Sequence, residues 1–172
     1  MRALSRTFLL LDRTIAGIES AVIVLVFLLM TALSALQVLG RQFDLPTTWT
    51  LELGAYLLVW LIFTGASLGV RTWQHVRFDV LLDMVPARAR RVADVAIEIC
   101  VLGFAVFLAL SSIALVRQQL AWGQQTATLP VNVSIAFTAV IVPISAIFMI
   151  IHVGQRLLAE KGTVQDEQPI HE

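Results

Sequence analysis

The sequence predicts an all-α membrane protein with four transmembrane helices, and three observations support this fold class. Of the 172 residues, 58% are hydrophobic and only 14% are charged, and the mean hydropathy is +0.85. Soluble domains average about 45–50% apolar and 25% charged residues. Four apolar stretches each come close to the roughly 20 residues that a helix needs to cross a membrane. We expect residues 1–153 to form a single four-helix membrane domain.

The first predicted span covers about residues 15–39 and follows a short amphipathic segment. Leu4, Phe8 and Leu11 recur there every three or four residues, which places them on one face of a helix. A cleavable signal peptide is the alternative. The apolar stretch is too long for one, and no A-x-A-like site ends it. We therefore expect an uncleaved anchor.

The second predicted span, about residues 49–70, begins after a linker that contains glycine, proline and threonine. Glu52 falls in its first turn, where a negative charge complements the helix dipole. Gly65 and Gly69 lie four residues apart, and such small residues let membrane helices approach closely. This spacing also occurs by chance, so a packing face at these glycines is one of two open interpretations.

Residues 71–91 form a basic connection with interleaved apolar residues. This pattern is typical of a short amphipathic helix that lies flat on a membrane surface. Proline removes a backbone donor, so we expect this helix to end near Pro86. The third span follows, at about residues 93–116.

The fourth predicted span covers about residues 131–152 and contains Pro143. Proline cannot donate to the carbonyl four residues earlier, so Ala139 loses its helical partner and a kink is favoured. The tail, residues 154–172, is polar, and we expect it to be disordered and cytoplasmic.

The orientation of the chain follows from its arginines and lysines. Three precede the first span, five lie between the second and third spans, and two follow the fourth span. The other two loops contain one each. The positive-inside rule therefore predicts that both termini and the basic connection are cytoplasmic.

The residue types do not indicate catalysis. The three histidines, His75, His152 and His171, lie at or beyond the predicted membrane boundaries. A haem-binding bundle needs paired axial histidines on facing helices. Phosphate-binding glycine loops, nucleophile elbows and HExxH motifs do not occur in the sequence. We expect no enzyme activity, no metal, no cofactor and no nucleic-acid partner.

Two acidic residues within the spans have two open interpretations. Glu19 and Glu98 lie about one to two turns inside the predicted cytoplasmic boundary, and acids inside spans are costly and face protein or water. Either residue could bind a proton or cation during transport. Alternatively, they pair with Arg13, Arg90 or Arg91. We favour ion pairs, because both acids are close to the boundary.

The tryptophans indicate anchoring and packing. Trp49, Trp73 and Trp122 fall at predicted interfaces, where indole rings commonly lie. Trp60 falls in the middle of the second span, where packing between helices explains it better.

Several of these residues occur in the order and spacing of a known family, namely Trp49, Glu52, Leu53, Trp60, Gly65, Ala66, Arg71, His75, Val76, Asp79, Leu82 and Pro86. The pattern resembles the small membrane subunit of TRAP (tripartite ATP-independent periplasmic) transporters, the DctQ-type family. The resemblance extends to G-Q-Q-T-A-T-L-P at residues 123–130 and to Pro143.

This resemblance implies a bacterial inner-membrane subunit that lies in the lipid bilayer and pairs with a large multi-span membrane subunit. A periplasmic substrate-binding protein would deliver an organic acid, and a sodium gradient would drive uptake. The small subunit would act as a scaffold. Trp49 and Glu52 would lie on the periplasmic side, available to these partners. Four residues would organise the cytoplasmic surface: Arg71, His75, Arg77 and Asp79.

Two other classes of function remain as alternatives. One is a self-sufficient four-helix exporter that acts as a homodimer and exchanges protons for substrate through Glu19. The other is an accessory or assembly protein without a transport role. Glu19 lies too near the predicted cytoplasmic end to favour the exporter, and we prefer the transporter subunit.

Overall fold

The computed structural model describes residues 2–72, 87–129 and 133–166, with side chains for residues 11–72, 92–93, 95–129 and 133–156. The amphipathic surface helix predicted between the second and third spans falls mainly on residues 73–86, outside this description. The same holds for three candidate site residues: His75, Arg77 and Asp79.

The described chain is helical, as predicted. Its elements are α1 (Arg2–Gln42), α2 (Trp49–Thr72), α4 (Ala87–Trp122), α5 (Ala136–Ala139) and α6 (Ile141–Asp166). Four segments are long and apolar enough to cross a membrane: Leu11–Gln42, Trp49–Thr72, Val95–Trp122 and Ala136–Arg156. The prediction of an all-α protein with four membrane spans is confirmed.

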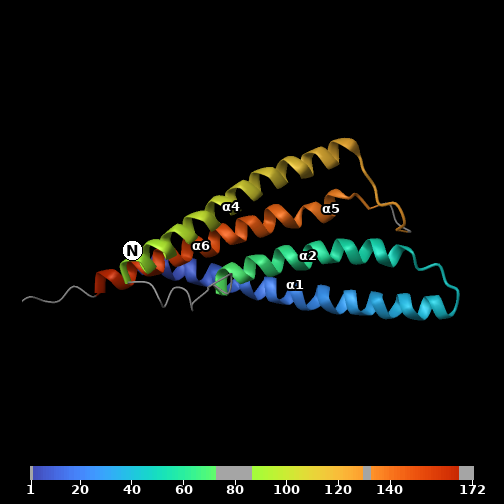
Figure 1. The fold of residues 1–172 in the computed structure, drawn as a ribbon, viewed down its shortest axis with the longest axis horizontal. Helices are drawn as coiled ribbons and strands as arrows, with labels where there is room; N and C mark the ends of the chain where they lie inside the picture. Colours follow the sequence, from blue (N-terminus) through green and yellow to red (C-terminus); the bar gives the residue numbers. More distant parts are fainter. Residues whose placement is uncertain (1, 73–86, 130–132, 167–172) are drawn as a thin grey trace, which may run out of the picture.

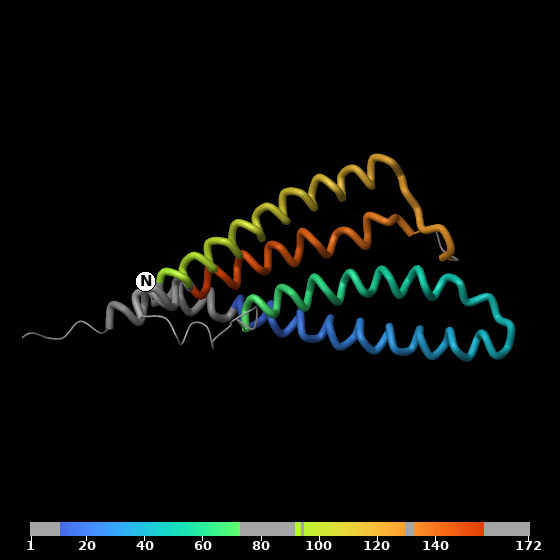
Figure 2. The backbone as a smooth tube through the Cα atoms, in the orientation of Figure 1, coloured from blue at the N-terminus to red at the C-terminus, as the bar shows by residue number. Residues whose placement is uncertain are grey.

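The helices are arranged as two antiparallel pairs, α1 with α2 and α4 with α6, and the contact between α6 and α2 joins the pairs. Helix α1 packs mainly on α2, whereas α6 packs on both α2 and α4. Figure 1 shows the helices close together at the end that contains the start of α1 and the end of α6, and spread apart toward the other end. We call the first the terminal end. We call the second the loop end, because it contains the α1–α2 and α4–α5 connections. Figure 2 shows in the backbone trace that the helices spread apart toward the loop end.

Helix α1 is longer than the predicted first span. It runs without interruption from Arg2 to Gln42, so the amphipathic segment and the span are one helix. At its end the Leu45 N–H donates to the Gly40 carbonyl at 2.9 Å, and Asp44 has a φ of 52°. This left-handed residue with its six-to-one hydrogen bond is a Schellman motif. It turns the chain toward α2.

The fourth span is divided in two near Pro143. The short helix α5 ends at Ala139 and α6 begins at Ile141, so the break follows the residue whose carbonyl Pro143 cannot reach. Residues 133–135, predicted to be part of the span, precede α5 and are not helical. Helix α6 then continues through Gly154 to Asp166, so this part of the tail, which we expected to be disordered, is helical.

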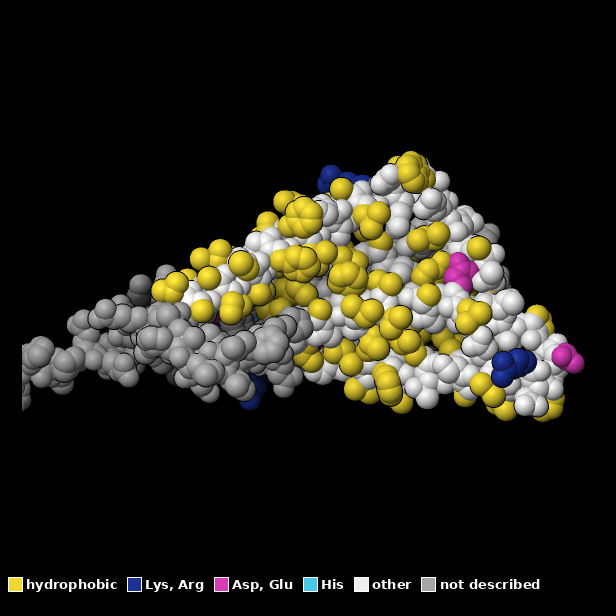
Figure 3. Space-filling view, in the orientation of Figure 1, with side chains coloured by type: hydrophobic (Ala, Val, Ile, Leu, Met, Phe, Trp, Pro, Cys, Tyr) yellow, Lys and Arg dark blue, Asp and Glu magenta, His cyan; other side chains and the backbone are white. Residues whose placement is uncertain are grey.

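A small apolar cluster is buried where α2, α4 and α6 meet. Val70, Ala105, Met149 and Val153 are buried together, from α2, α4 and α6. Many large apolar side chains are instead exposed, including Phe27 on α1 and Phe107 on α4. Figure 3 shows hydrophobic side chains spread over the visible face of the helices. Such a surface is suited to lipid or to an apolar partner rather than to water.

Candidate functional site

A cluster of four ionisable side chains connects three helices at the terminal end. The Arg71 Nε of α2 donates to Asp12 Oδ2 of α1 at 2.9 Å. His152 of α6 lies between two carboxylates of α1. Its Nδ1 is 2.6 Å from Asp12 Oδ1, and its Nε2 is 3.1 Å from Glu19 Oε2. We call these four residues the His152 cluster.

The centre of the His152 cluster is shielded from its surroundings. Glu19 and His152 are each only 1% exposed, whereas Asp12 and Arg71 are partly accessible. A buried charge is tolerated only where a partner of opposite charge or a hydrogen bond compensates it. The cluster therefore holds α1, α2 and α6 together through groups that stabilise one another.

The ion-pair interpretation of the intramembrane acids needs correction in its partners. Glu19 bonds to His152 of α6 and not to Arg13, which lies on its own helix and is exposed. Glu98 lies 3.7 Å from the Nε of Arg156, an arginine that we did not consider. The side chains of Arg90 and Arg91 lie outside the described residues. Glu19 therefore pairs across helices and not along its own helix, whereas the expected pairing of Glu98 with Arg90 or Arg91 stays a prediction.

Sequence reasoning missed Asp12 and His152. His152 lies four residues before the end of the apolar segment Ala136–Arg156, and its side chain is buried among the helices. One signal was present, because Asp12 and Glu19 are seven residues apart and thus share a helix face. Another was that His152 interrupts an otherwise apolar run. Neither signal shows which helix provides the partner.

At the loop end, Glu52 attaches the α4–α5 connection to α2. Its carboxylate accepts from the N–H groups of Ala127 and Thr128 at 2.9 and 2.6 Å, and from the Thr128 hydroxyl. The Tyr56 hydroxyl donates to it at 2.6 Å from the next turn of α2. Glu52 lies in the first turn of α2 as predicted, but its oxygens are engaged within the chain.

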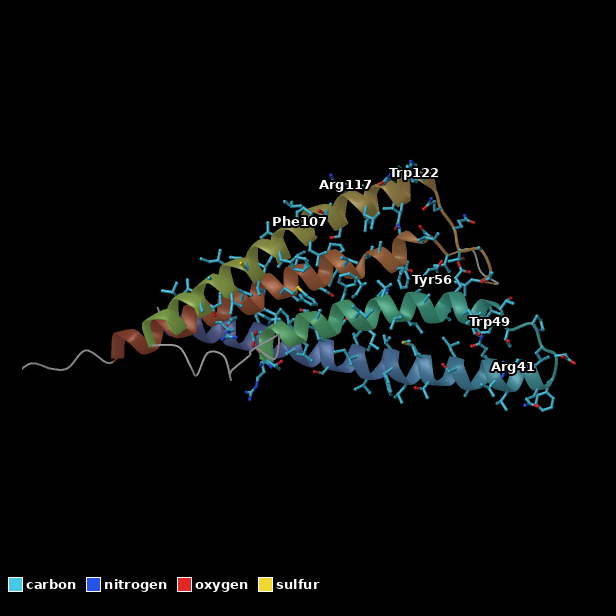
Figure 4. The ribbon with its side chains drawn as sticks, viewed as in Figure 1. Arg41, Trp49, Tyr56, Phe107, Arg117 and Trp122 are labelled. Carbon is cyan, nitrogen blue, oxygen red and sulfur yellow. The ribbon has the colours of Figure 1, made fainter. Side chains whose placement is uncertain are left out.

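The connection that Glu52 holds is itself ordered by backbone hydrogen bonds. The Thr126 N–H donates to Val133, and the Ile135 N–H donates to Gln124. Gly123, with a φ of 61°, turns the chain out of α4. Figure 4 shows Tyr56 on the side of α2 that faces this connection. The loop is therefore fixed at both of its ends and by Glu52 between them.

An apolar cavity of about 450 Å³ lies beneath this loop, between α1, α2 and α5. Trp60 is in its wall, and its ring centroid is 5.2 Å from that of Phe137 of α5 at an interplanar angle of 30°. This contact agrees with our interpretation of Trp60 as a packing residue. Trp49 lines the same cavity nearer the loop end, together with Val22, Leu25, Val26, Leu29, Leu53, Tyr56, Leu57, Leu129, Val133 and Thr138.

Gly65, the first of the two spaced glycines on α2, makes no tight contact with the described residues. A Cβ added at Gly65 would meet no atom within 4 Å, so this glycine is not needed for packing among the described residues. Gly69 lies one turn further along α2. The space beside Gly65 is open to contact with another chain.

No metal site is found in the residues that the structure describes, because no group of three or more histidine, cysteine, aspartate or glutamate side chains is placed to hold an ion. The His152 cluster shows the reason. The imidazole lies between the two carboxylates and directs one ring nitrogen at each, so the three side chains do not converge on one point.

Comparison with known proteins decides the family. The sequence model described as "Tripartite ATP-independent periplasmic transporters, DctQ component" matches residues 30–160, which is most of the chain. The chain belongs to the DctQ family. This confirms the resemblance that the order and spacing of its residues predicted.

Individual DctQ relatives match over shorter segments. The C4-dicarboxylate TRAP transporter small permease proteins of Vibrio cholerae and Pseudomonas aeruginosa are 33% and 38% identical, over 48% and 38% of this chain. These matches span 36% and 31% of the relatives' own lengths. The isethionate TRAP transporter permease protein DctMQ of Oleidesulfovibrio alaskensis is 21% identical over 65% of this chain and 17% of its own length.

The residues matched by the DctQ model include one of the two polar sites completely and the other only in part. Glu52 and its loop fall inside the matched residues, as do Arg71 and His152. Asp12 and Glu19 precede residue 30 and fall outside. The family match therefore covers the whole of the loop-end site and only half of the His152 cluster.

Proposed function

We propose that this DctQ protein is the small permease subunit of a TRAP-type secondary transporter in the bacterial inner membrane. It would serve as a scaffold for a large membrane subunit in the uptake of an organic acid. A sodium gradient would drive uptake, and a periplasmic binding protein would deliver the substrate. The observation that carries this proposal is the family match over residues 30–160.

The relatives support a large membrane partner. The segment that matches this chain makes up only 17% of the DctMQ permease of O. alaskensis. It makes up only 11% of the sialic acid TRAP transporter permease protein SiaT of Haemophilus influenzae. In both proteins, most of the permease lies outside the matched segment. A second membrane chain would take the place of that polypeptide here.

The distribution of polar groups supports a scaffold role. The ionisable side chains described inside the bundle bond to one another across helices, as Glu19 does with His152 and Glu98 with Arg156. A substrate path needs polar groups that can exchange partners with a solute. By contrast, the apolar side chains exposed on α1 and α4 provide a broad surface for another membrane protein.

The substrate class is inferred from the names of the relatives. Those names specify C4-dicarboxylates, isethionate and sialic acid, all of which are organic anions. We propose the same broad class here. We assign specificity to the partner proteins, because the cavity beneath the loop is lined almost entirely by apolar side chains.

Co-purification tests this proposal. The tagged chain would be expressed in its native membrane, extracted gently and analysed for bound proteins. We expect a large multi-span protein at equal stoichiometry. Vesicles that contain both chains should take up an organic acid only with a sodium gradient and the binding protein. Isolation of a homodimer that moves solute alone would overturn the proposal in favour of a proton-coupled exporter.

A further inference from the structure

Three buried side-chain oxygen atoms of α1 and α2 have no hydrogen-bond partner among the described residues. They are Glu19 Oε1, Thr64 Oγ1 and Ser67 Oγ. Their residues are 1%, 3% and 0% exposed. A buried polar atom without a partner destabilises the fold, and most buried polar atoms in proteins are satisfied by protein or ordered water. Three of them together require an explanation.

Helix geometry places these oxygens at one level of the bundle. Helices α1 and α2 are antiparallel, and the bond between Arg71 and Asp12 fixes their register. Glu19 lies seven residues from Asp12, and Thr64 lies seven residues from Arg71, in the same direction along the bundle. Each is displaced by about 10 Å at 1.5 Å per residue, and each returns to the same helix face. Ser67 lies on the adjoining turn of α2.

The two contacts of His152 need one proton more than a neutral imidazole and two ionised carboxylates provide. A neutral imidazole has one N–H donor and one bare nitrogen. Both ring nitrogens of His152 face a carboxylate oxygen, at 2.6 and 3.1 Å. With two ionised carboxylates, a bare nitrogen would set one lone pair against another. One further proton, on His152 or on a carboxyl group, makes both contacts hydrogen bonds.

The charges then sum to zero. Asp12 and Glu19 contribute two negative charges, and Arg71 and a protonated His152 contribute two positive charges. The nearest other charged pair described on α6 is Arg156 with Glu98 of α4, and these two residues offset each other. A neutral cluster is the arrangement that costs least inside a membrane.

We propose that the His152 cluster is a charge-neutral site that holds a proton and binds water between Glu19, Thr64 and Ser67. A water molecule can donate to Glu19 Oε1 and accept from a hydroxyl group, so it satisfies both kinds of unpartnered oxygen. A metal cation would add positive charge to a cluster that is already neutral. The site uses this chain's own residues, so the inference goes beyond the proposed function and does not depend on it.

Nitrogen NMR of the full chain in lipid nanodiscs tests the proton. Histidine would be labelled with ¹⁵N, and the His152 signals would be assigned with the variant His152→Asn. We expect both ring nitrogens to be protonated at neutral pH. A neutral ring together with an infrared band of a protonated carboxyl group, absent in Glu19→Gln or Asp12→Asn, would equally support a held proton. A neutral ring without such a band would overturn the proposal.

The variant Glu19→Gln distinguishes a held proton from a purely structural histidine. It removes one negative charge and keeps the shape of the side chain. We expect His152 to lose one ring proton and become neutral, because Asp12 and Arg71 already offset each other. A ring that stays doubly protonated in this variant would contradict charge balance as the cause.

The proposed water is tested by a structure of the chain with its bound partners, at a resolution that shows water. We expect water density within hydrogen-bond distance of Glu19 Oε1. The variant Ser67→Ala should weaken or shift it. Ser34→Ala is the matched control, because the Ser34 hydroxyl bonds to the Met30 carbonyl of its own helix. An empty site in the wild type, or density unchanged by Ser67→Ala, would overturn the assignment of water.

Discussion

The two ends of this protein are held together by different kinds of contact. At the terminal end the helices lie close together, and His152 reaches two carboxylates of α1 across the interface. At the loop end the helices spread apart, and Glu52 instead accepts from the backbone of the α4–α5 connection. Figure 4 places Tyr56 and Trp49 toward this open end. Where the helices converge, side chains of different helices bond directly to each other. Where they diverge, a side chain of α2 bonds to the backbone of the loop that follows α4.

This difference has an energetic consequence. Groups in the His152 cluster are buried, so the loss of one partner leaves another charge without compensation in a medium of low polarity. Glu52 lies at the first turn of α2 and holds an exposed loop, so its loss should release the loop without unfolding the bundle. The terminal end should therefore determine global stability, and the loop end local order.

The largest expected effect is the loss of His152. The variant His152→Ala removes the bonds to Asp12 and Glu19 and leaves Glu19 buried and unpaired. We expect the free energy of unfolding to decrease by about 3–5 kcal/mol. Denaturant titration in mixed micelles measures this value, with Ser34→Ala as the control. A cost no larger than that of the control would show that the terminal end does not determine stability.

Replacement of Glu52 should give a large but local effect. In Glu52→Ala the amides of Ala127 and Thr128 lose their acceptor, and we expect their hydrogen exchange to become at least about tenfold faster. Thr128→Val should have a smaller effect, because the backbone donors remain. Mass spectrometry of the loop peptide measures both variants. If the amides in the half of α6 that lies at the terminal end also exchanged hydrogen faster, the stabilities of the two ends would not be independent.

A moderate effect is expected where α2 meets α5. Trp60 and Phe137 form a tilted aromatic pair, and such pairs contribute about 0.5–1.5 kcal/mol beyond burial. A double-mutant cycle with Trp60→Leu and Phe137→Leu isolates the coupling energy. Strictly additive effects would show that the two rings do not stabilise each other.

The smallest effect is expected at Gly65. An added methyl group meets no described atom, so Gly65→Ala should change the stability of the isolated chain by less than about 0.5 kcal/mol. Reduced recovery of the large subunit with Gly65→Ala, at unchanged stability, would place Gly65 at the partner surface.

Gly40 provides the contrasting glycine variant. A Cβ at Gly40 would overlap the Thr47 side chain, so Gly40→Ala should destabilise the loop end by about 1–3 kcal/mol.

Much of the fold could be predicted because it depends on local composition. Apolar runs of sufficient length indicated four spans. Pro143 indicated a kink, and the structure has a break between Ala139 and Ile141. The ends of the helices were less predictable. The amphipathic segment before the first span is helical, as its spacing predicted, and is part of α1. Gly154 does not end α6, because polar residues can extend a helix beyond the apolar segment.

The candidate sites were predicted only in part. Glu19 and Glu98 were recognised as unusual because acids within apolar spans are costly, and Glu52 was selected for its place in the first turn of the second span. Their partners could not be predicted. Our hypothesis considered Arg13 as a partner of Glu19, because it is a neighbour along the helix, and the observed partner is His152.

The sequence by itself determined that this chain is a four-span membrane protein of the DctQ family, because span length, apolar composition and motif order are properties of neighbouring residues. Only the tertiary structure decided which polar groups meet. Glu19 and His152 are separated by 133 residues, and Glu52 and Ala127 by 75. Contacts of this range depend on how four helices pack and diverge, and helical periodicity shows the face of each helix but not its neighbour.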